Sequence, residues 1–136
     1  MKGGTQVKRI NFSSGAPLEE LVGYSRMVKV GEHIYIGGTT AVLPDGTVHG
    51  DTALEQADYI FRKFINLLNE AGANPSDVIK IKAYVTDMSF AKEVGEAYSP
   101  YFKDVRPLFT MVETPKLNRP SQMVEIELEA FITDEN

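Results

Sequence analysis

The clearest pattern along the chain is an apolar stripe at helical spacing between Asp51 and Ala71. Apolar residues recur there every three or four positions, at Leu54, Ala57, Phe61, Phe64, Leu68 and Ala71. This spacing places them on one face of a helix. Thr52 and Glu55 have the spacing of a capping box at its start, and Gly72 stands where a left-handed C-terminal cap belongs. We therefore predict a helix over Asp51–Ala71 with one buried face.

Strict alternation of apolar and polar residues predicts two strands. In the first, Ile79, Ile81, Ala83 and Val85 alternate with Lys80, Lys82 and Tyr84. In the second, Gln122–Ile132, the apolar residues are Val124, Ile126, Leu128, Ala130 and Ile132, and they alternate with Glu125, Glu127 and Glu129. Such alternation gives a strand one buried face and one polar face.

Shorter segments complete the predicted fold. We predict strands over Met27–Val30, His33–Val42 and Leu108–Thr114, and a second helix over Ser89–Phe102. The first two of these strands flank a Gly-Glu turn and form a hairpin. Two helices and five or six strands predict an α+β fold, a mostly antiparallel sheet with both helices on one face. The other face must then meet water or another subunit.

Composition places the chain among ordinary globular domains. Its 136 residues and 15.1 kDa predict a single domain over residues 1–136. Fourteen Lys and Arg against 19 Asp and Glu give a net charge of −5. This charge argues against a nucleic-acid partner, because nucleic-acid binders normally show a basic face. The sequence contains no cysteine, which excludes disulfides, thiolate catalysis and cysteine-bound zinc.

The start of the chain lacks the apolar segment of a signal peptide, and no apolar run approaches membrane-spanning length. We therefore expect a cytoplasmic protein with no membrane contact. The sequence has two histidines and no phosphate-binding glycine motif, so we expect neither a metal nor a nucleotide cofactor.

Candidate chemistry lies on the polar face of the last predicted strand. Glu125, Glu127 and Glu129 stand there about 6.5–7 Å apart from one to the next. If this face is buried between subunits, at least one carboxylate has a raised pKa and can act as a general acid or base. The alternative is a solvated face that carries no chemistry.

Two arginines and three other residues are further candidates. Arg26 and Arg106 can bind an anion, because a guanidinium holds a carboxylate through two parallel hydrogen bonds. A surface ion pair is the alternative for each. Tyr24 is either a packing residue or a site residue. We expect Phe109 and Met111 on the sheet face opposite the helices, in core or interface packing.

A set of short motifs along the chain points to one family. The motifs are Gly23-Tyr24, Val30-Gly31, Ile36-Gly37-Gly38, Gln56, Asn66-Leu67-Leu68, Glu70-Ala71-Gly72, Asp77-Val78, Tyr84-Val85-Thr86-Asp87, Pro107-Leu108-Phe109-Thr110-Met111-Val112, Leu117 and Val124-Glu125-Ile126. From about Gly23 to Phe131 the sequence resembles the Rid family, which is also called YjgF-like or endoribonuclease L-PSP.

The resemblance implies a chorismate-mutase-like fold and a homotrimer whose sheets form a central barrel, with ligand sites in clefts between subunits. It also implies hydrolysis of reactive enamines and imines, such as 2-aminoacrylate, to a 2-keto acid and ammonia without a cofactor. Two alternatives stay open. One is a ligand-binding or regulatory trimer without catalysis, and the other is an endoribonuclease or translation inhibitor, which the acidic charge opposes.

Site residues follow from the resemblance position by position. Glu125 matches the family glutamate that positions or activates a water, and Tyr24 matches a site tyrosine. Met111 matches a position whose backbone contacts the ligand. Gly38 lies inside a predicted strand, where glycine often marks a close approach, and we expect it beside the ligand.

The substrate-binding arginine of the family falls on Phe109, which is a departure from the family pattern. A phenyl ring cannot form charge-assisted hydrogen bonds to a carboxylate. Arg26 or Arg106 would then have to supply the charge. The Gly23-Tyr24-Ser25-Arg26 start and the Arg106-Pro107 pair resemble a branch of the family that lacks the usual arginine.

Overall fold

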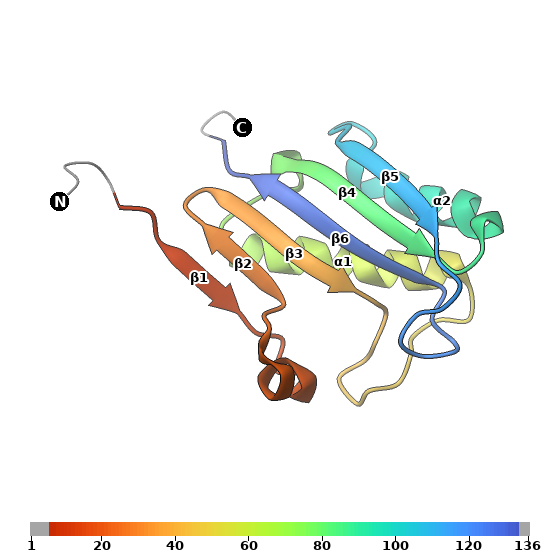
Figure 1. Cartoon of the computed structure of the whole chain (residues 1–136). Coiled ribbons are helices and arrows are strands. Elements are labelled where there is room, and N and C mark those ends of the chain that lie inside the picture. The colour runs from red at the N-terminus through yellow and green to blue at the C-terminus, as the bar shows by residue number, and fades with distance from the viewer. Residues whose placement is uncertain (1–5, 134–136) are drawn as a thin grey trace.

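A six-stranded sheet with its helices on one face organises residues 6–133, the part of the chain that the computed structural model describes (Figure 1). The strands are β1 Arg9–Phe12, β2 Met27–Val30, β3 His33–Thr39, β4 Val78–Val85, β5 Leu108–Glu113 and β6 Val124–Phe131. The helices are α1 Ala53–Glu70 and α2 Ala91–Phe102, with short helical turns η1 Glu19–Gly23, η2 Pro75–Asp77 and η3 Met88–Phe90. The expectation that there is no signal peptide rests on the opening residues, of which the first five lie outside the described range.

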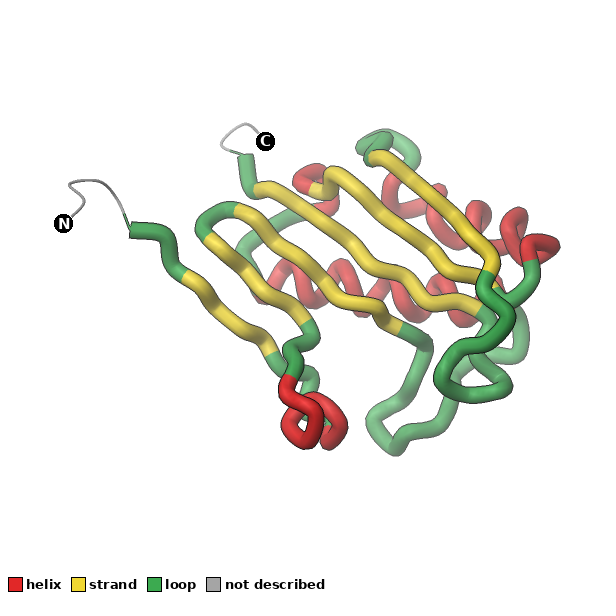
Figure 2. Tube along the Cα trace, in the orientation of Figure 1, coloured by secondary structure: helices red, strands yellow, loops and turns green. Residues whose placement is uncertain are grey.

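The strand order is β1-β2-β3-β6-β4-β5. All neighbouring strands pair antiparallel except β4 and β5, which are parallel and joined through α2. Figure 2 shows both long helices behind the sheet, so the opposite face, which we call the open face, carries no helix. The predicted α+β fold with two helices on one face is confirmed.

The core lies between the helices and the sheet. On α1 the stripe predicted from the sequence is buried from Ala57 to Ala71, with Phe61, Phe64 and Leu68 fully enclosed. Leu54, predicted on the same buried face, is 38% exposed, because it lies in the first turn of the helix. The alternation in β6 buries every second residue from Val124 to Ala130. These residues form one continuous cluster with the buried side chains of β3 and β4. Because side chains alternate along a strand, burial of this set on the helix side turns the polar residues between them toward the open face.

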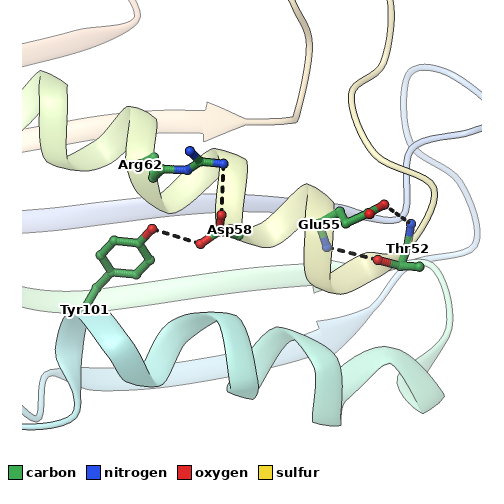
Figure 3. A network of polar contacts seen from close by, with 5 residues as sticks. All are labelled: Thr52, Glu55, Asp58, Arg62 and Tyr101. Carbon is green, nitrogen blue, oxygen red and sulfur yellow. Dashed lines mark hydrogen bonds and ion pairs between the residues drawn. The ribbon is translucent and has the colours of Figure 1, made fainter.

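The predicted capping box at the start of α1 is present (Figure 3). The Thr52 hydroxyl accepts a hydrogen bond from the Glu55 amide at 3.1 Å, and the Glu55 carboxylate accepts one from the Thr52 amide at 3.3 Å. Further along α1, Asp58 forms an ion pair with Arg62 at 3.1 Å and accepts a hydrogen bond from the Tyr101 hydroxyl at 2.8 Å. Burial, with the help of Asp58, raises the pKa of Tyr101 to about 12, so this hydroxyl stays a donor that ties α2 to α1.

Two local expectations are corrected here, and one strand was missed. The strand predicted over His33–Val42 ends at Thr39, and Val42 forms only an isolated bridge with Val48. Ile79, predicted on the buried face, is 44% exposed, because the register between β4 and β6 shifts between Val78 and Lys80. Strand β1 was not predicted, since its four residues are mostly exposed and show no apolar alternation.

Candidate functional site

Glu125 stands in the middle of the sheet, on the open face. Its neighbours in β6, Val124 and Ile126, are fully buried on the helix side, and alternation turns Glu125 the other way. Burial raises the pKa of this half-buried carboxyl, while the charge of Arg26 lowers it and the charge of Glu127 raises it further. The structure therefore holds a carboxyl suited to proton transfer closer to neutral pH than an ordinary glutamate.

Gly38 makes room for the Glu125 carboxylate. The pairing of β3 with β6 is irregular between Ile36 and Thr39, which places Gly38 in a bulge. A Cβ added to Gly38 would lie 2.7 Å from Glu125 Oε2. Only glycine leaves the carboxylate its present position, which is the physical basis of the close approach expected from the sequence.

Arg26 is the residue just before β2, and its side chain reaches the same bulge. Its Nη2 donates a hydrogen bond to the Gly38 carbonyl at 2.6 Å, and its own carbonyl accepts one from the Gly37 amide at 3.0 Å. Within residues 6–133 its buried Nε has no hydrogen-bond partner. Of the two arginines considered from the sequence, Arg26 is the one that the structure brings to Glu125.

The segment before Arg26 is anchored by a buried carboxylate. Glu19 is 4% exposed and accepts hydrogen bonds from Ser13 and from the amide and hydroxyl of Ser14. Burial opposes its ionisation, but the hydrogen bonds from Ser14 and Ser13 and the charge of Arg26 leave the pKa of Glu19 lowered. Tyr24 follows this turn, donates its amide to the Glu19 carbonyl and leaves its side chain 42% exposed.

A hollow of about 440 Å³ lies beside Glu125 on the open face. Its lining residues are Tyr84, Thr114, Lys116, Leu117, Asn118 and Glu125. Most of this wall comes from the loop that follows β5. The sequence patterns missed Lys116 and Asn118, because an irregular loop has no periodicity that shows which side chains face inward.

Phe109 and Met111 are not on the open face, which corrects the expectation from the sequence. β5 runs parallel to β4, with Phe109 opposite Ile81 and Met111 opposite Ala83. Since Ile81 and Ala83 are fully buried under the helices, Phe109 and Met111 face the same way. The Phe109 ring stacks on Tyr98 of α2, with 4.3 Å between the ring centroids.

Arg106 lies far from Glu125 within one chain. It is exposed and has φ 61°, just before β5 begins. Glu125 pairs with Tyr84, which pairs in turn with Val112. Arg106 precedes Val112 by six residues, which is about 20 Å along an extended strand.

Two findings limit the kinds of site present in residues 6–133. No group of three or more His, Asp or Glu side chains there is arranged to hold a metal ion. None of the helices in this range is long and apolar enough to cross a membrane.

Comparison with known proteins places the chain in one family. The family model described as endoribonuclease L-PSP matches residues 15–132. A RutC family protein of Pyrococcus abyssi is 31% identical over 125 residues, which cover 91% of this chain and 95% of that protein.

One solved structure and one distant relative extend the comparison. The crystal structure of a YjgF/YER057c/UK114 family member from Mycobacterium tuberculosis is 38% identical, covers 92% of this chain and all of its own, and superimposes with a TM-score of 0.84. The reactive intermediate deaminase A of Arabidopsis thaliana chloroplasts is 23% identical over 111 residues, covering 81% of this chain and 58% of that protein. The chain therefore belongs to the endoribonuclease L-PSP family, the YjgF-like or Rid family that its motifs resemble.

Proposed function

We propose that this protein is a cofactor-independent hydrolase of a small imine or enamine, with Glu125 as its general acid and base. The observation that carries the proposal is the Glu125 carboxyl, which is half-buried beside an open hollow and has a raised pKa. The name of the Arabidopsis relative, a reactive intermediate deaminase, supports the class of reaction. The net charge of −5 opposes the ribonuclease activity that the family description suggests.

The proposed reaction needs only water and one carboxyl. An enamine first takes a proton on carbon from solvent and becomes a protonated imine. The Glu125 carboxylate then accepts a proton from water as the water oxygen bonds to the imine carbon, and the C=N electron pair moves to nitrogen, which gives a neutral carbinolamine. The protonated Glu125 returns its proton to the nitrogen, and the C–N bond breaks as an oxygen lone pair forms the C=O bond and the hydroxyl proton passes to solvent. The products are a carbonyl compound and ammonia.

The surrounding residues have supporting roles in this proposal. Gly38 lets the carboxylate sit close to the backbone. The charge of Arg26 keeps a fraction of Glu125 ionised, since burial alone would favour the protonated form. By family resemblance, Tyr24 and the Met111 backbone contact the ligand in a cleft that a second subunit completes.

A homotrimer is part of the proposal, because the open face carries exposed apolar side chains. Tyr35, Leu108 and Val112 are 45%, 65% and 37% exposed, and they lie on strands without a helix on that side (Figure 1). Packing this face against other copies would also bury Glu125 further. Gel filtration should give a mass near three times 15.1 kDa, and a stable monomer at micromolar concentration would contradict the shared cleft.

A ligand-binding or regulatory trimer without catalysis is the second candidate. It is favoured by Phe109, which stands in place of the family arginine and packs on Tyr98. Substitution of Glu125 separates the two candidates. A hydrolase loses turnover, whereas a binding protein has no turnover to lose and shows only an altered affinity.

The pH dependence of hydrolysis tests the role of Glu125. Because the reaction begins with the carboxylate, kcat/KM should fall as the pH drops through the raised pKa of Glu125. Glu127→Gln should move this acidic limb to lower pH, because the Glu127 charge raises the pKa of Glu125. Arg26→Met should move it to higher pH, because the Arg26 charge lowers that pKa.

The matched control is Glu129→Gln, which removes a carboxylate two positions farther along the same strand face. It should leave the acidic limb where it is. A limb that stays fixed in both Glu127→Gln and Arg26→Met would show that another group controls the reaction.

A further inference from the structure

We infer that Gln56 is a positioning residue for Glu125, because its buried amide fixes both the start of β6 and the end of the loop beside the hollow. The inference rests on the proposed function, in which the place of the Glu125 carboxyl sets the rate. Gln56 is fully buried near the start of α1, and it does not line the hollow. Its effect on the reaction therefore passes through other residues.

The side-chain amide of Gln56 has both its donors and its acceptor engaged. Its Nε2 donates hydrogen bonds to the Ser121 carbonyl at 2.9 Å and to the Gly50 carbonyl at 3.2 Å. Its Oε1 accepts a hydrogen bond from the Met123 amide at 2.9 Å. A buried amide that is satisfied in this way has one orientation. It therefore holds together three backbone segments, two of which lie 65 and 67 residues away in the sequence.

The bond to Met123 determines where β6 begins. Figure 1 shows the start of α1 at the end of the sheet from which β6 sets out, and Met123 is the residue just before that strand. The Met123 amide donates to Gln56, and its carbonyl accepts from the Thr86 amide at 3.0 Å. Glu125 follows two residues later, about 7 Å along an extended strand. A displacement of Met123 is therefore passed on to Glu125.

A second buried amide ties the same loop to the bulge that faces Glu125. Gln122 is 2% exposed, accepts a hydrogen bond from the Arg119 amide at 2.9 Å and donates one to the Thr40 hydroxyl at 3.1 Å. Thr40 comes two residues after Gly38, against which the Glu125 carboxylate lies. Since Gln56 holds Ser121, the neighbour of Gln122, it supports this connection as well.

No apolar side chain can replace Gln56 in this arrangement. Methionine has a similar length, but it would leave the Met123 amide and the Ser121 carbonyl without their partner in a buried place. Unpaired buried backbone groups are unfavourable, so both segments should move toward water. On the other side, a Cβ at Gly50 would lie 3.2 Å from Gln56 Cγ, which shows how closely the backbone packs on this side chain.

The first test is the hydrolysis of 2-aminoacrylate by Gln56→Met. Misplacement of a catalytic group by 1 Å can cost about 10²-fold in rate, and a smaller displacement should lower kcat roughly tenfold. Leu68→Ala is the matched control, since Leu68 is fully buried on the same helix and its truncation leaves a cavity. This control should lower the melting temperature and keep its kcat at temperatures where the protein is folded.

The second test follows the titration of the Glu125 carboxyl by ¹³C NMR, which requires no turnover. Burial is the chief cause of the raised pKa of Glu125. In Gln56→Met a looser β6 admits water, so the pKa of Glu125 should fall toward the ordinary glutamate value. The other titratable or charged groups around this carboxyl stay the same in the variant, namely Arg26, Glu127, Tyr84 and Lys116. Leu68→Ala should leave the titration unchanged.

Gln56→Glu tests rescue and replaces Gln56→Met if that variant does not fold. A carboxyl at this position can accept from the Met123 amide and, once protonated, can donate to the Ser121 carbonyl. Its kcat relative to the wild type should therefore rise as the pH falls. A ratio that is the same at every pH would contradict the inference.

The outcomes for Gln56 and for the proposed function are separable. A folded Gln56→Met variant with the wild-type titration of Glu125, or with the wild-type kcat, overturns the inference. The same holds if Leu68→Ala loses as much kcat as Gln56→Met. A shifted titration in Gln56→Met together with no hydrolysis by the wild type would overturn the hydrolase and leave the positioning of Glu125 by Gln56 standing.

Discussion

Glu125→Gln should lower imine hydrolysis by about 10²–10⁴-fold, the usual contribution of a general acid or base. Glutamine has nearly the same shape as glutamate, but it can neither accept nor return the proton of the attacking water. Binding of a carbonyl compound of the product class should persist, because glutamine leaves the shape of the hollow unchanged. Steady-state kinetics with the purified variant measure the first effect, and calorimetry measures the second.

The same variant should be more stable than the wild type at neutral pH. The pKa of Glu125 is raised in the folded protein, chiefly by burial, so ionisation of this carboxyl costs folding free energy. This cost is absent below the unfolded pKa and grows as the pH rises through the folded pKa. Glu125→Gln should therefore raise the free energy of unfolding at pH 7–8 and lose that advantage in acid.

These opposite effects separate a catalytic role from a structural one. A residue needed mainly for folding would lose stability and activity together when it is replaced. Denaturant unfolding of both proteins across the pH range measures the difference. A Glu125→Gln variant with full turnover would contradict the assignment of Glu125.

Gly38→Ala should lower turnover by about 10²-fold, because small displacements of a catalytic group cost rate steeply. The new Cβ would lie 2.7 Å from Glu125 Oε2, so the carboxylate has to move. Since this carboxylate is the flexible end of a side chain, the free energy of unfolding should change by no more than about 1 kcal/mol.

Gly95→Ala in α2 is the matched control. A Cβ at Gly95 meets nothing within 4 Å, and alanine is favoured over glycine inside a helix by roughly 0.5–1 kcal/mol. This variant should gain stability and keep its turnover. A Gly38→Ala variant with wild-type turnover would show that the position of the Glu125 carboxylate is not critical.

Local patterns predicted most of the fold. The apolar stripe of α1, its capping box and the alternation in β4 and β6 depend on residues close together in the sequence. Strand β1 is too short and exposed to leave a pattern. The shift that exposes Ile79 depends on how β4 pairs with β6, and pairing between distant segments cannot be read from either strand alone.

The site was predictable only in part, for the same reason. Glu125, Arg26 and Gly38 were named separately from the sequence, but their proximity follows from the pairing of β2, β3 and β6. Phe109 was expected on the open face, because the parallel pairing of β5 with β4 leaves no signal in β5 itself. Lys116 lies in an irregular loop. The end of this loop is held by hydrogen bonds of two buried side chains, Gln56, which is far away in the sequence, and Gln122, which lies close to Lys116 in the sequence.

The most direct test of the central claim, imine hydrolysis at Glu125, is a competition assay with 2-aminoacrylate. A dehydratase generates this enamine from serine, and semicarbazide traps whatever escapes enzymatic hydrolysis. The wild type should divert the intermediate to the 2-keto acid and ammonia and so reduce the trapped product, whereas Glu125→Gln should not. A wild-type protein that leaves the trapped product at the level of buffer alone would contradict the account.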